Sequence, residues 1–340
     1  MVPRKAFVLF AFVISGGCGT GSRGGHMADG LDAAAGVAGT GGDGGAGAGA
    51  GANGAGEDGG SICGHCPGYD HTGSLGTIPP ILDELSGLAA SHRFAGWFYA
   101  DNDSTDGPRI FLLNGAAELE AELDLPGAPT KDIEDVAVGP CPEGTCAYVA
   151  DIGDNNLDRD DYAIYRAPEP AVLPVTGGKL PLTYERFPFT YPDGAHDAET
   201  LLVHPQTGRV FVVVKDPDAP SRVYEMPTPL VKDQPAQLGL VATLSVPKSA
   251  DMVTAGSFHP CGDRLLIRTR RHLFELSLPS SGSLLAGDLV SIFTAPPVEV
   301  PVAKEVQGEA VTYALDGLGY YTSGESAGGP QPELSSVDCR

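Results

Sequence analysis

The fold is decided by the stretch Glu199-Thr-Leu-Leu-Val-His-Pro205, which recurs as Glu134-Asp-Val-Ala-Val-Gly-Pro140, Thr254-Ala-Gly-Ser-Phe-His-Pro260 and Glu309-Ala-Val-Thr-Tyr-Ala-Leu315. Each copy is followed by a turn signal that contains glycine. A weaker fifth copy begins at Ser86, so that the starts lie 48, 65, 55 and 55 residues apart. Self-similarity at this period is typical of β-propeller blades rather than of a sandwich.

After each turn comes a second run of aromatic and β-branched residues, at 97–100, 147–150, 210–214, 265–267 and 320–323. Third and fourth runs follow in the first four units, for example at 109–113 and 119–125. Four short strands per unit make one blade. The sequence therefore predicts an all-β propeller of about five four-stranded blades, and its spacing is also compatible with six.

The last unit ends too early to supply all of its strands, because only 15 residues follow Glu325. A propeller must close its ring to protect the edges of its first and last strands. We therefore expect residues 61–81 to complete the last blade.

The phase of the repeat predicts a charged ring, because equivalent positions in the blades lie at equal depth around one axis. Glu134, Glu199 and Glu309 share the first position of the repeat. The second runs end at charged residues, which we expect to share another position: Asp101, Asp151, Lys215, Arg268 and Glu325. With Asp135, Asp154, Asn155 and Asp197 nearby in sequence, the ring has an excess of carboxylates, and we expect it at the mouth of the channel.

Clustered carboxylate and amide oxygens suit a hard cation such as Ca²⁺. The predicted metal ligands are Glu134, Asp135, Asp151, Asp154, Glu199 and Glu309. For residues 151–156 the alternative is ordinary turn chemistry, because Asp, Asn and Gly are also the residues that turns require. A separate loop calcium site is compatible with residues 101–107, although their acids are offset by one from an EF-hand loop.

The repeated unit, an acid followed by small and aliphatic residues, a turn and an apolar strand, resembles exported phytase-like propellers. The similar groups are the esterase-like phytase family and the SdiA-regulated family, and the resemblance covers roughly residues 84–326. Gly308 and Glu309 stand in exchanged order relative to the strand of those families. The resemblance implies a calcium-bearing propeller and hydrolysis of phosphoesters or carboxyesters.

The first residues resemble an export signal and a lipid anchor. Two cations, Arg4 and Lys5, precede an apolar run at 6–14, which predicts a signal peptide over 1–17. The stretch Ile14-Ser15-Gly16-Gly17-Cys18 resembles the lipobox of bacterial lipoproteins and implies lipidation of Cys18. Residues 18–60 predict a disordered tether, because 18 of the 42 residues from 19 to 60 are glycine and large apolar residues are nearly absent.

The predicted domain at 61–340 contains 18 basic and 39 acidic residues, a net charge of −21. Such a surface repels phosphate backbones and excludes nucleic acid as a partner, whereas it tolerates cations. The expected location is the cell envelope, at the outer membrane or cell surface. The expected partners are the membrane, through the anchor, and an envelope protein or a small-molecule ligand.

Six cysteines remain beside Cys18: Cys63, Cys66, Cys141, Cys146, Cys261 and Cys339. An even number in an exported chain indicates disulfides, although fifteen connectivities are open. Cys141 and Cys146 flank a turn and should be bonded. We expect a local disulfide between Cys63 and Cys66, and one from Cys261 to Cys339 that fixes the C-terminus.

Two functions fit these features, and the sequence leaves open whether the chain is an enzyme. The first is a Ca²⁺-dependent hydrolase of phosphoesters or esters, with Lys215, Arg268 and Glu325 as candidate catalytic residues. The second is a non-catalytic propeller on a flexible stalk that binds a ligand or another protein.

Overall fold

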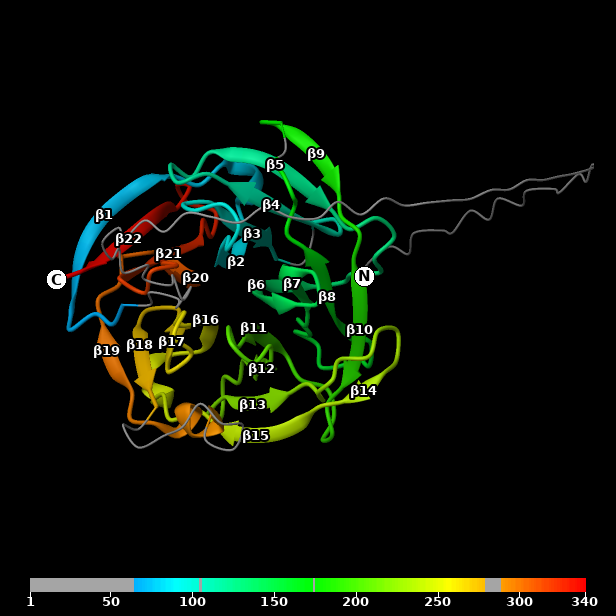
Figure 1. Cartoon of the computed structure of the whole chain (residues 1–340). Helices are drawn as coiled ribbons and strands as arrows, with labels where there is room; N and C mark the ends of the chain where they lie inside the picture. Colours follow the sequence, from blue (N-terminus) through cyan, green and yellow to red (C-terminus); the bar gives the residue numbers. More distant parts are fainter. Residues whose placement is uncertain (1–63, 104–105, 174, 279–288) are drawn as a thin grey trace, which may run out of the picture. The chain divides into compact units, whose positions relative to one another are not determined.

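A computed structural model of the chain describes residues 64–103, 106–173, 175–278 and 289–340. The predicted signal peptide, Cys18, the tether and Cys63 lie outside the described residues. The described residues form five mainly antiparallel sheets that surround a central axis (Figure 1). The predicted all-β propeller with five blades is confirmed.

The first blade contains β2 (Leu85–Ala90), β3 (Phe98–Asn102), β4 (Arg109–Leu113) and β5 (Leu119–Asp124). The second contains β6 (Ile133–Cys141), β7 (Gly144–Asp151), β8 (Tyr162–Pro168) and β10 (Glu185–Thr190). The third contains β11 (Ala198–Val203), β12 (Val210–Val214), β13 (Arg222–Glu225) and β15 (Gly239–Thr243). The fourth contains β16 (Val253–Phe258), β17 (Arg264–Thr269), β18 (Leu273–Ser277) and β19 (Val298–Val300).

The fifth blade closes the ring with strands from both ends of the described chain. It contains β20 (Gln307–Tyr313), β21 (Gly319–Glu325), β22 (Glu333–Cys339) and, outermost, β1 (Tyr69–Thr77). Figure 1 shows β1 (blue) beside β22 (red). The prediction that residues 61–81 complete the last blade is thus confirmed.

Two short strands extend blades in a way that the sequence pattern did not predict. β9 (Gly178–Pro181) follows β8 in the chain, yet it pairs in parallel with β5 of the preceding blade. β14 (Ala236–Gln237) likewise pairs in parallel with β10 of the preceding blade. Each covers an outer edge that would otherwise expose unpaired backbone groups.

The core lies between the blades, because the face of each sheet packs on the next. Five apolar clusters each combine residues of two neighbouring blades, so that the ring is buried all the way round. Two buried histidines reinforce these contacts. The Nε2 atoms of His204 and His259 hydrogen-bond to the carbonyl oxygens of Gly262 and Gly317, each in the first hairpin turn of the next blade.

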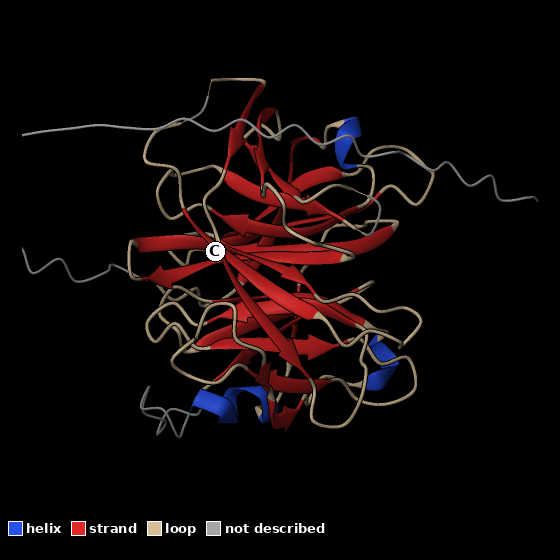
Figure 2. Ribbon diagram, turned by 90° about the vertical axis from the view of Figure 1, so that its right-hand side faces the viewer, coloured by secondary structure: helices blue, strands red, loops and turns tan. Residues whose placement is uncertain are grey.

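Helix contributes little to the described part of the chain. Its only helices are the short 3-10 segments η1 (Pro80–Leu82), η2 (Lys248–Ala250) and η3 (Leu289–Thr294), and Figure 2 shows the strands from the side. None of these helices has the length and apolar character needed to cross a membrane.

One disulfide follows the local spacing of the cysteines, and another follows the closure of the ring. Cys141 and Cys146 are bonded across the β6–β7 turn, as predicted. The predicted partners of Cys66 and Cys339 are wrong, because these two residues bond to each other across a sequence separation of 273. Cys261 is disulfide-bonded as well. Pairing of β1 with β22 brings Cys66 next to Cys339, which no local motif reveals.

Candidate metal centre

A β-bulge interrupts the first strand of every blade at the same position. The register shifts at residues 86–87, Glu134, Glu199, Thr254 and Glu309, which are the positions that the sequence repeat aligns. A bulge re-aims the side chain of the extra residue and is often found beside functional sites. At three of the five bulges the extra residue is a glutamate, and all three glutamates are at least 94% buried.

Two of these glutamates lie in a cluster of carboxylates at the channel mouth. Ligand oxygens of Asp103, Asp132 and Glu134 lie within 4.8 Å of one another, and so do those of Glu134, Asp197 and Glu199. Glu134 belongs to both groups and is only 1% exposed. Among the described residues Glu309 belongs to neither group.

Glu134 is the central side chain of this carboxylate cluster. Among the described residues, neither of its carboxylate oxygens has a hydrogen-bond partner. Its Oε1 lies 2.0 Å, and Oδ2 of Asp132 lies 2.4 Å, from the place where a Cβ on Gly153 would be. Glycine at 153 therefore leaves room for both carboxylates. A buried carboxylate without a partner is costly unless a proton or a cation compensates its charge.

Lys215 already compensates the negative charge of two carboxylates in the cluster, Asp197 and Glu199. Its ammonium group forms an ion pair with Glu199 and lies 3.6 Å from Oδ2 of Asp197. Burial lowers the pKa of Lys215, but its charge contact and hydrogen bond with Glu199, together with the charges of Asp197 and Glu134, hold it above the ordinary value. In the described part of the chain no ammonium or guanidinium group forms an ion pair with Asp103, Asp132 or Glu134, so this group is the better place for a metal ion.

Three carboxyls of the cluster have raised pKa values when no metal is present: Asp132, Glu134 and Glu199. Burial, together with the charge of Asp103, raises the pKa of Asp132 to about 7. Burial and then the charge of Glu199 raise the pKa of Glu134 well above its ordinary value. Burial also raises the pKa of Glu199 to about 7, although Lys215 opposes the shift. A cation that enters this cluster must therefore displace protons.

These shifts predict how stability depends on pH. In the unfolded chain such carboxyls lose their protons near pH 4, whereas in the folded protein Asp132 and Glu199 keep theirs up to about pH 7. Between these values the folded state binds more protons, so that raising the pH favours unfolding. In chelator we expect the free energy of unfolding to fall by roughly 2–4 kcal/mol from pH 5 to pH 8. Urea unfolding at both pH values measures this difference, and a protein that is more stable at pH 8 would contradict the titrating cluster.

The remaining predicted ligands have partners within the protein and do not join the carboxylate cluster. The two oxygens of Asp135 accept hydrogen bonds from the backbone N–H groups of Val136 and Leu201. Asp151 forms an ion pair with Arg159 at 2.7 Å. Asp154 accepts hydrogen bonds from the backbone at 158 and 159 and from the hydroxyl of Tyr162. For Asp151 and Asp154 these contacts correspond to the turn alternative, and Asn155 is exposed.

The expectation that the second runs end at one shared position is wrong. Asp151 pairs with Ile133, the residue just before the bulge of its blade. Arg268 pairs with Ala255, the residue just after the bulge of its blade. Glu325 pairs with Gln307, two residues before the bulge of its blade. Because side chains alternate between the two faces of a strand, this offset separates Asp151 from Arg268 and Glu325. Asp101 follows Ala100, which pairs with Leu88 after its bulge, and is therefore in register with Asp151.

The three candidate catalytic residues have different surroundings. Lys215 lies in the carboxylate cluster. Glu325 accepts a hydrogen bond from the side-chain amide of Gln307 and is partly buried at the mouth, where burial and the charge of Asp103 raise its pKa. Arg268 is 1% exposed and forms an ion pair with Glu305 beneath Gly308. The positive charge of the partly exposed Arg270 acts to lower the pKa values of both Glu309 and Glu325.

Sequence reasoning missed Asp132 as a ligand and did not place Asp103 with Glu134, and it placed Asp197 in the charged ring but not among the metal ligands. A signal for two of them was present, because Asp132 and Asp197 each stand two residues before a bulge glutamate. Side chains two residues apart lie on the same side of an extended segment. The repeated Asp-x-Glu pattern thus marks the cluster, whereas Asp103 follows β3 and carries no repeat signal.

Two other groups with metal-ligand chemistry do not form metal sites. One contains Cys141 and Cys146 with Glu143, and the other contains Cys261 with His65, His259 and Asp263. All three cysteines are bonded in disulfides and offer no thiolate. Nδ1 of His259 accepts a hydrogen bond from the backbone N–H of Cys261.

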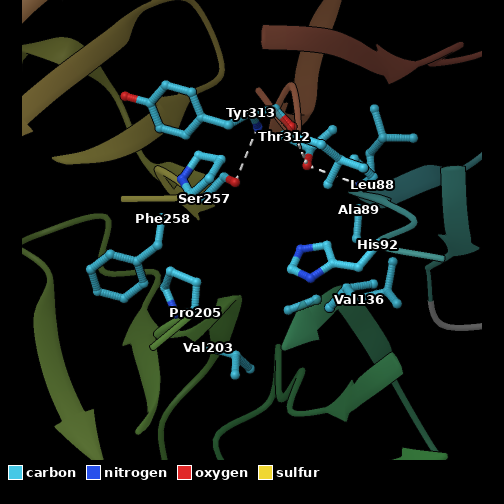
Figure 3. Close-up of a pocket in the computed structure, with 16 residues that line it drawn as sticks. Leu88, Ala89, His92, Val136, Val203, Pro205, Ser257, Phe258, Thr312 and Tyr313 are labelled. Atoms are coloured by element: carbon cyan, nitrogen blue, oxygen red, sulfur yellow. Dashed lines mark hydrogen bonds between the residues drawn. The ribbon is translucent and has the colours of Figure 1, made fainter. Parts of the chain in front are cut away.

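The opposite end of the channel has a different character. There the ends of the five first strands enclose a cavity of about 50 Å³ that is lined mostly by residues of apolar type, and His92 points into it (Figure 3). Desolvation lowers the pKa of His92, although the charge of Glu169 opposes the shift, so that its imidazole stays neutral near pH 7. The carboxylate cluster thus lies at the other end of the channel, where the first strands begin.

Comparisons with known proteins add little to this geometry. No family model matches the chain, and neither does any curated protein. Among solved structures, a gluconolactonase from Xanthomonas campestris aligns with 81% of this chain and 96% of its own length, with 10% identity and a TM-score of 0.42. At that level the likeness carries no argument about function. The resemblance to the esterase-like phytase and SdiA-regulated families stays a prediction.

Proposed function

We propose that the propeller binds one Ca²⁺ ion at the channel mouth through Asp103, Asp132 and Glu134. The observation that carries this proposal is Glu134, which is buried, belongs to both groups of carboxylates and has no described hydrogen-bond partner for either oxygen. All ligands on offer are oxygens, which is the donor set of a hard cation. Ca²⁺ suits the site better than Mg²⁺, because it accepts irregular geometry and several carboxylates.

We propose further that this centre supports hydrolysis of a phosphoester or carboxyester. A bound Ca²⁺ would supply polarisation of a phosphoryl or carbonyl oxygen. Lys215 stands beside the cluster and Arg270 at the mouth, and both would offset the negative charge that develops on the substrate. The carboxyl of Glu325, with its raised pKa, is suited to accept a proton from the attacking water.

The test is a screen of phosphoester and carboxyester substrates with and without Ca²⁺. We expect turnover that requires Ca²⁺ and falls at least tenfold in Lys215→Met and Glu325→Gln. Saturable Ca²⁺ binding without turnover of any ester would overturn the hydrolase and favour the binding module. In that case the cluster would stiffen the mouth for recognition, and the proposed metal site would remain.

Gly153 provides a prediction about the metal site alone. A methyl group at this position would overlap with Oε1 of Glu134 and Oδ2 of Asp132. We expect Gly153→Ala to weaken Ca²⁺ binding about tenfold, which corresponds to about 1.4 kcal/mol. The matched control is Gly239→Ala, whose added methyl group would meet no atom within 4 Å. Calorimetric titration measures both variants, and equal affinities would show that the cluster does not hold the ion.

We also propose that the chain is exported and anchored in the cell envelope by lipid on Cys18. The lipobox-like stretch at 14–18 and the preceding apolar run support this proposal. Two or more acyl chains would make the anchoring stable. Cys18→Ser should move the protein from the membrane fraction to the soluble fraction after cell lysis, and an unchanged membrane fraction would contradict lipidation. The acidic charge of the domain argues against nucleic acid as a partner.

A further inference from the structure

The backbone of Asp132 is hydrogen-bonded on both its N–H and its carbonyl side to the segment 151–154 at the end of β7. The backbone N–H groups at 152 and 153 donate to the carbonyl oxygen of Asp132 at 3.0 and 3.2 Å. In return, Oδ1 of Asp151 accepts hydrogen bonds from the backbone N–H groups of Lys131 and Asp132 at 3.2 and 3.0 Å. The place of Asp132 in the carboxylate cluster therefore depends on the conformation of segment 151–154.

The same segment holds a second carboxylate of the cluster. The backbone N–H group of Asp154 donates to Oδ1 of Asp197 at 2.8 Å. The residue before it, Gly153, lies against the carboxylate of Glu134. Segment 151–154 is thus hydrogen-bonded to one member of each group in the cluster and lies against the glutamate that the two groups share. A shift of its backbone would move Asp132 and Asp197 together.

Arg159 holds this segment from outside the carboxylate cluster. Its side chain is only 7% exposed, and its guanidinium group donates in three directions. Nη1 donates to the carbonyl oxygen of Gly153, and Nη2 donates to Oδ1 of Asp151 at 2.7 Å. Nε donates to Oδ1 of Asp161 at 3.4 Å. The planar fork of an arginine can satisfy such separate acceptors at once, whereas the ammonium group of a lysine is a single point charge.

We propose that Arg159 is a positioning residue of the calcium centre, which keeps Asp132 and Asp197 in place through the contacts of its guanidinium fork with segment 151–154. This inference rests on the proposed Ca²⁺ site and adds to it a residue that does not touch the ion. The acids with which Arg159 pairs, Asp151 and Asp161, lie outside the cluster. Groups that orient the ligands of a metal ion typically change its affinity by about 10–100-fold.

The charge of Arg159 and its contacts act on Ca²⁺ binding in opposite directions. A positive charge near the cluster opposes the entry of a cation. Arg159 is close enough for this effect, because its charge counteracts the rise that burial causes in the pKa of Asp132. Removal of the charge alone would tighten Ca²⁺ binding, whereas loss of the contacts would weaken it. The sign of the change in affinity therefore separates positioning from electrostatics.

The first test is a calorimetric titration of Ca²⁺ into the full chain at pH 7. We expect Arg159→Met to weaken Ca²⁺ binding at least about tenfold. The matched control is Arg166→Met, because the side chain of Arg166 is 12% exposed and forms an ion pair with Glu185 at the other end of β8. This control should lose stability and keep the wild-type affinity for Ca²⁺. Unchanged or tighter binding in Arg159→Met would overturn the proposal.

Arg159→Lys keeps the charge and provides the test if the methionine variant does not fold. A lysine cannot replace the contacts to Gly153 and Asp151 at the same time. We expect its affinity for Ca²⁺ to lie between those of the wild type and of Arg159→Met. Wild-type affinity in Arg159→Lys would show that the guanidinium fork does not position the ligands.

The second test needs no metal. The backbone N–H groups of Asp132 and Asp154 are hydrogen-bonded in the metal-free protein. In chelator we expect hydrogen exchange at both amides to be faster in Arg159→Met than in Arg166→Met, because only the first variant frees segment 151–154. Equal exchange in the two variants would overturn the positioning role. A wild type that binds no Ca²⁺ but shows this difference in exchange would overturn the metal centre instead, so the two failures are distinguishable.

Discussion

Replacing Lys215 with methionine should lower the free energy of unfolding of the metal-free protein by about 3 kcal/mol at pH 8. The ammonium group is the cation held within the group of Glu134, Asp197 and Glu199, and it forms an ion pair with Glu199. Its removal leaves buried carboxylates without a compensating charge, and uptake of a proton by Glu199 relieves only part of this cost. Urea unfolding in chelator measures the loss.

The control is Lys131→Met. Lys131 forms its ion pair with Asp161 at 2.6 Å, but both side chains are at least 40% exposed. Such surface pairs contribute about 0–1 kcal/mol. In Ca²⁺ the Lys215 variant should regain more stability than the wild type does, because Asp197 and Glu199 become available to a second ion. An unchanged stability in chelator would show that Lys215 does not hold the cluster together.

Replacing Glu134 with glutamine should abolish stabilisation by Ca²⁺. At a Ca²⁺ concentration about 1,000 times the dissociation constant, the wild type should gain about 4 kcal/mol, and the variant should gain little of it. In chelator the variant should be at least as stable as the wild type, because glutamine removes a buried charge that otherwise needs a proton. Thermal unfolding of both proteins in chelator and in Ca²⁺ tests these four values.

Glu309→Gln provides the matched control for Glu134→Gln. Glu309 is also a buried bulge glutamate, and burial raises its pKa to about 8, yet it belongs to neither group of the carboxylate cluster. This variant should therefore keep the gain from Ca²⁺. If the gain disappears in Glu309→Gln and persists in Glu134→Gln, the ion is bound elsewhere around the ring.

Much of the fold could be predicted, because each blade repeats the same sequence pattern of short strands and turns. The repeat aligned the five bulge positions, and the truncated last unit implied closure by residues 61–81. The parallel additions β9 and β14 could not be found in this way, since short edge strands have no pattern of their own. The Cys66–Cys339 bond also depends on pairing between the two ends of the described chain, which no local spacing encodes.

The candidate site was less predictable than the fold, because a cluster depends on register as well as on composition. Glu134 and Glu199 meet because their bulges are equivalent and their blades are neighbours. Arg268 and Glu325 were aligned from the apparent ends of apolar runs, and pairing shows them at different depths. An error of one residue in such an alignment moves a side chain to the other face of its strand. The backbone partners that occupy Asp135 leave no mark in the sequence.

The most direct test of the central claim is a calorimetric titration of Ca²⁺ into the full chain at pH 7, in two buffers with different enthalpies of protonation. We expect saturable binding of one ion with release of protons to the buffer, because the pKa values of Asp132 and Glu134 are raised in the metal-free protein. We expect loss of both the binding and the proton release in Glu134→Gln. No saturable binding in the wild type, or identical binding and proton release in Glu134→Gln, would contradict the proposed calcium centre.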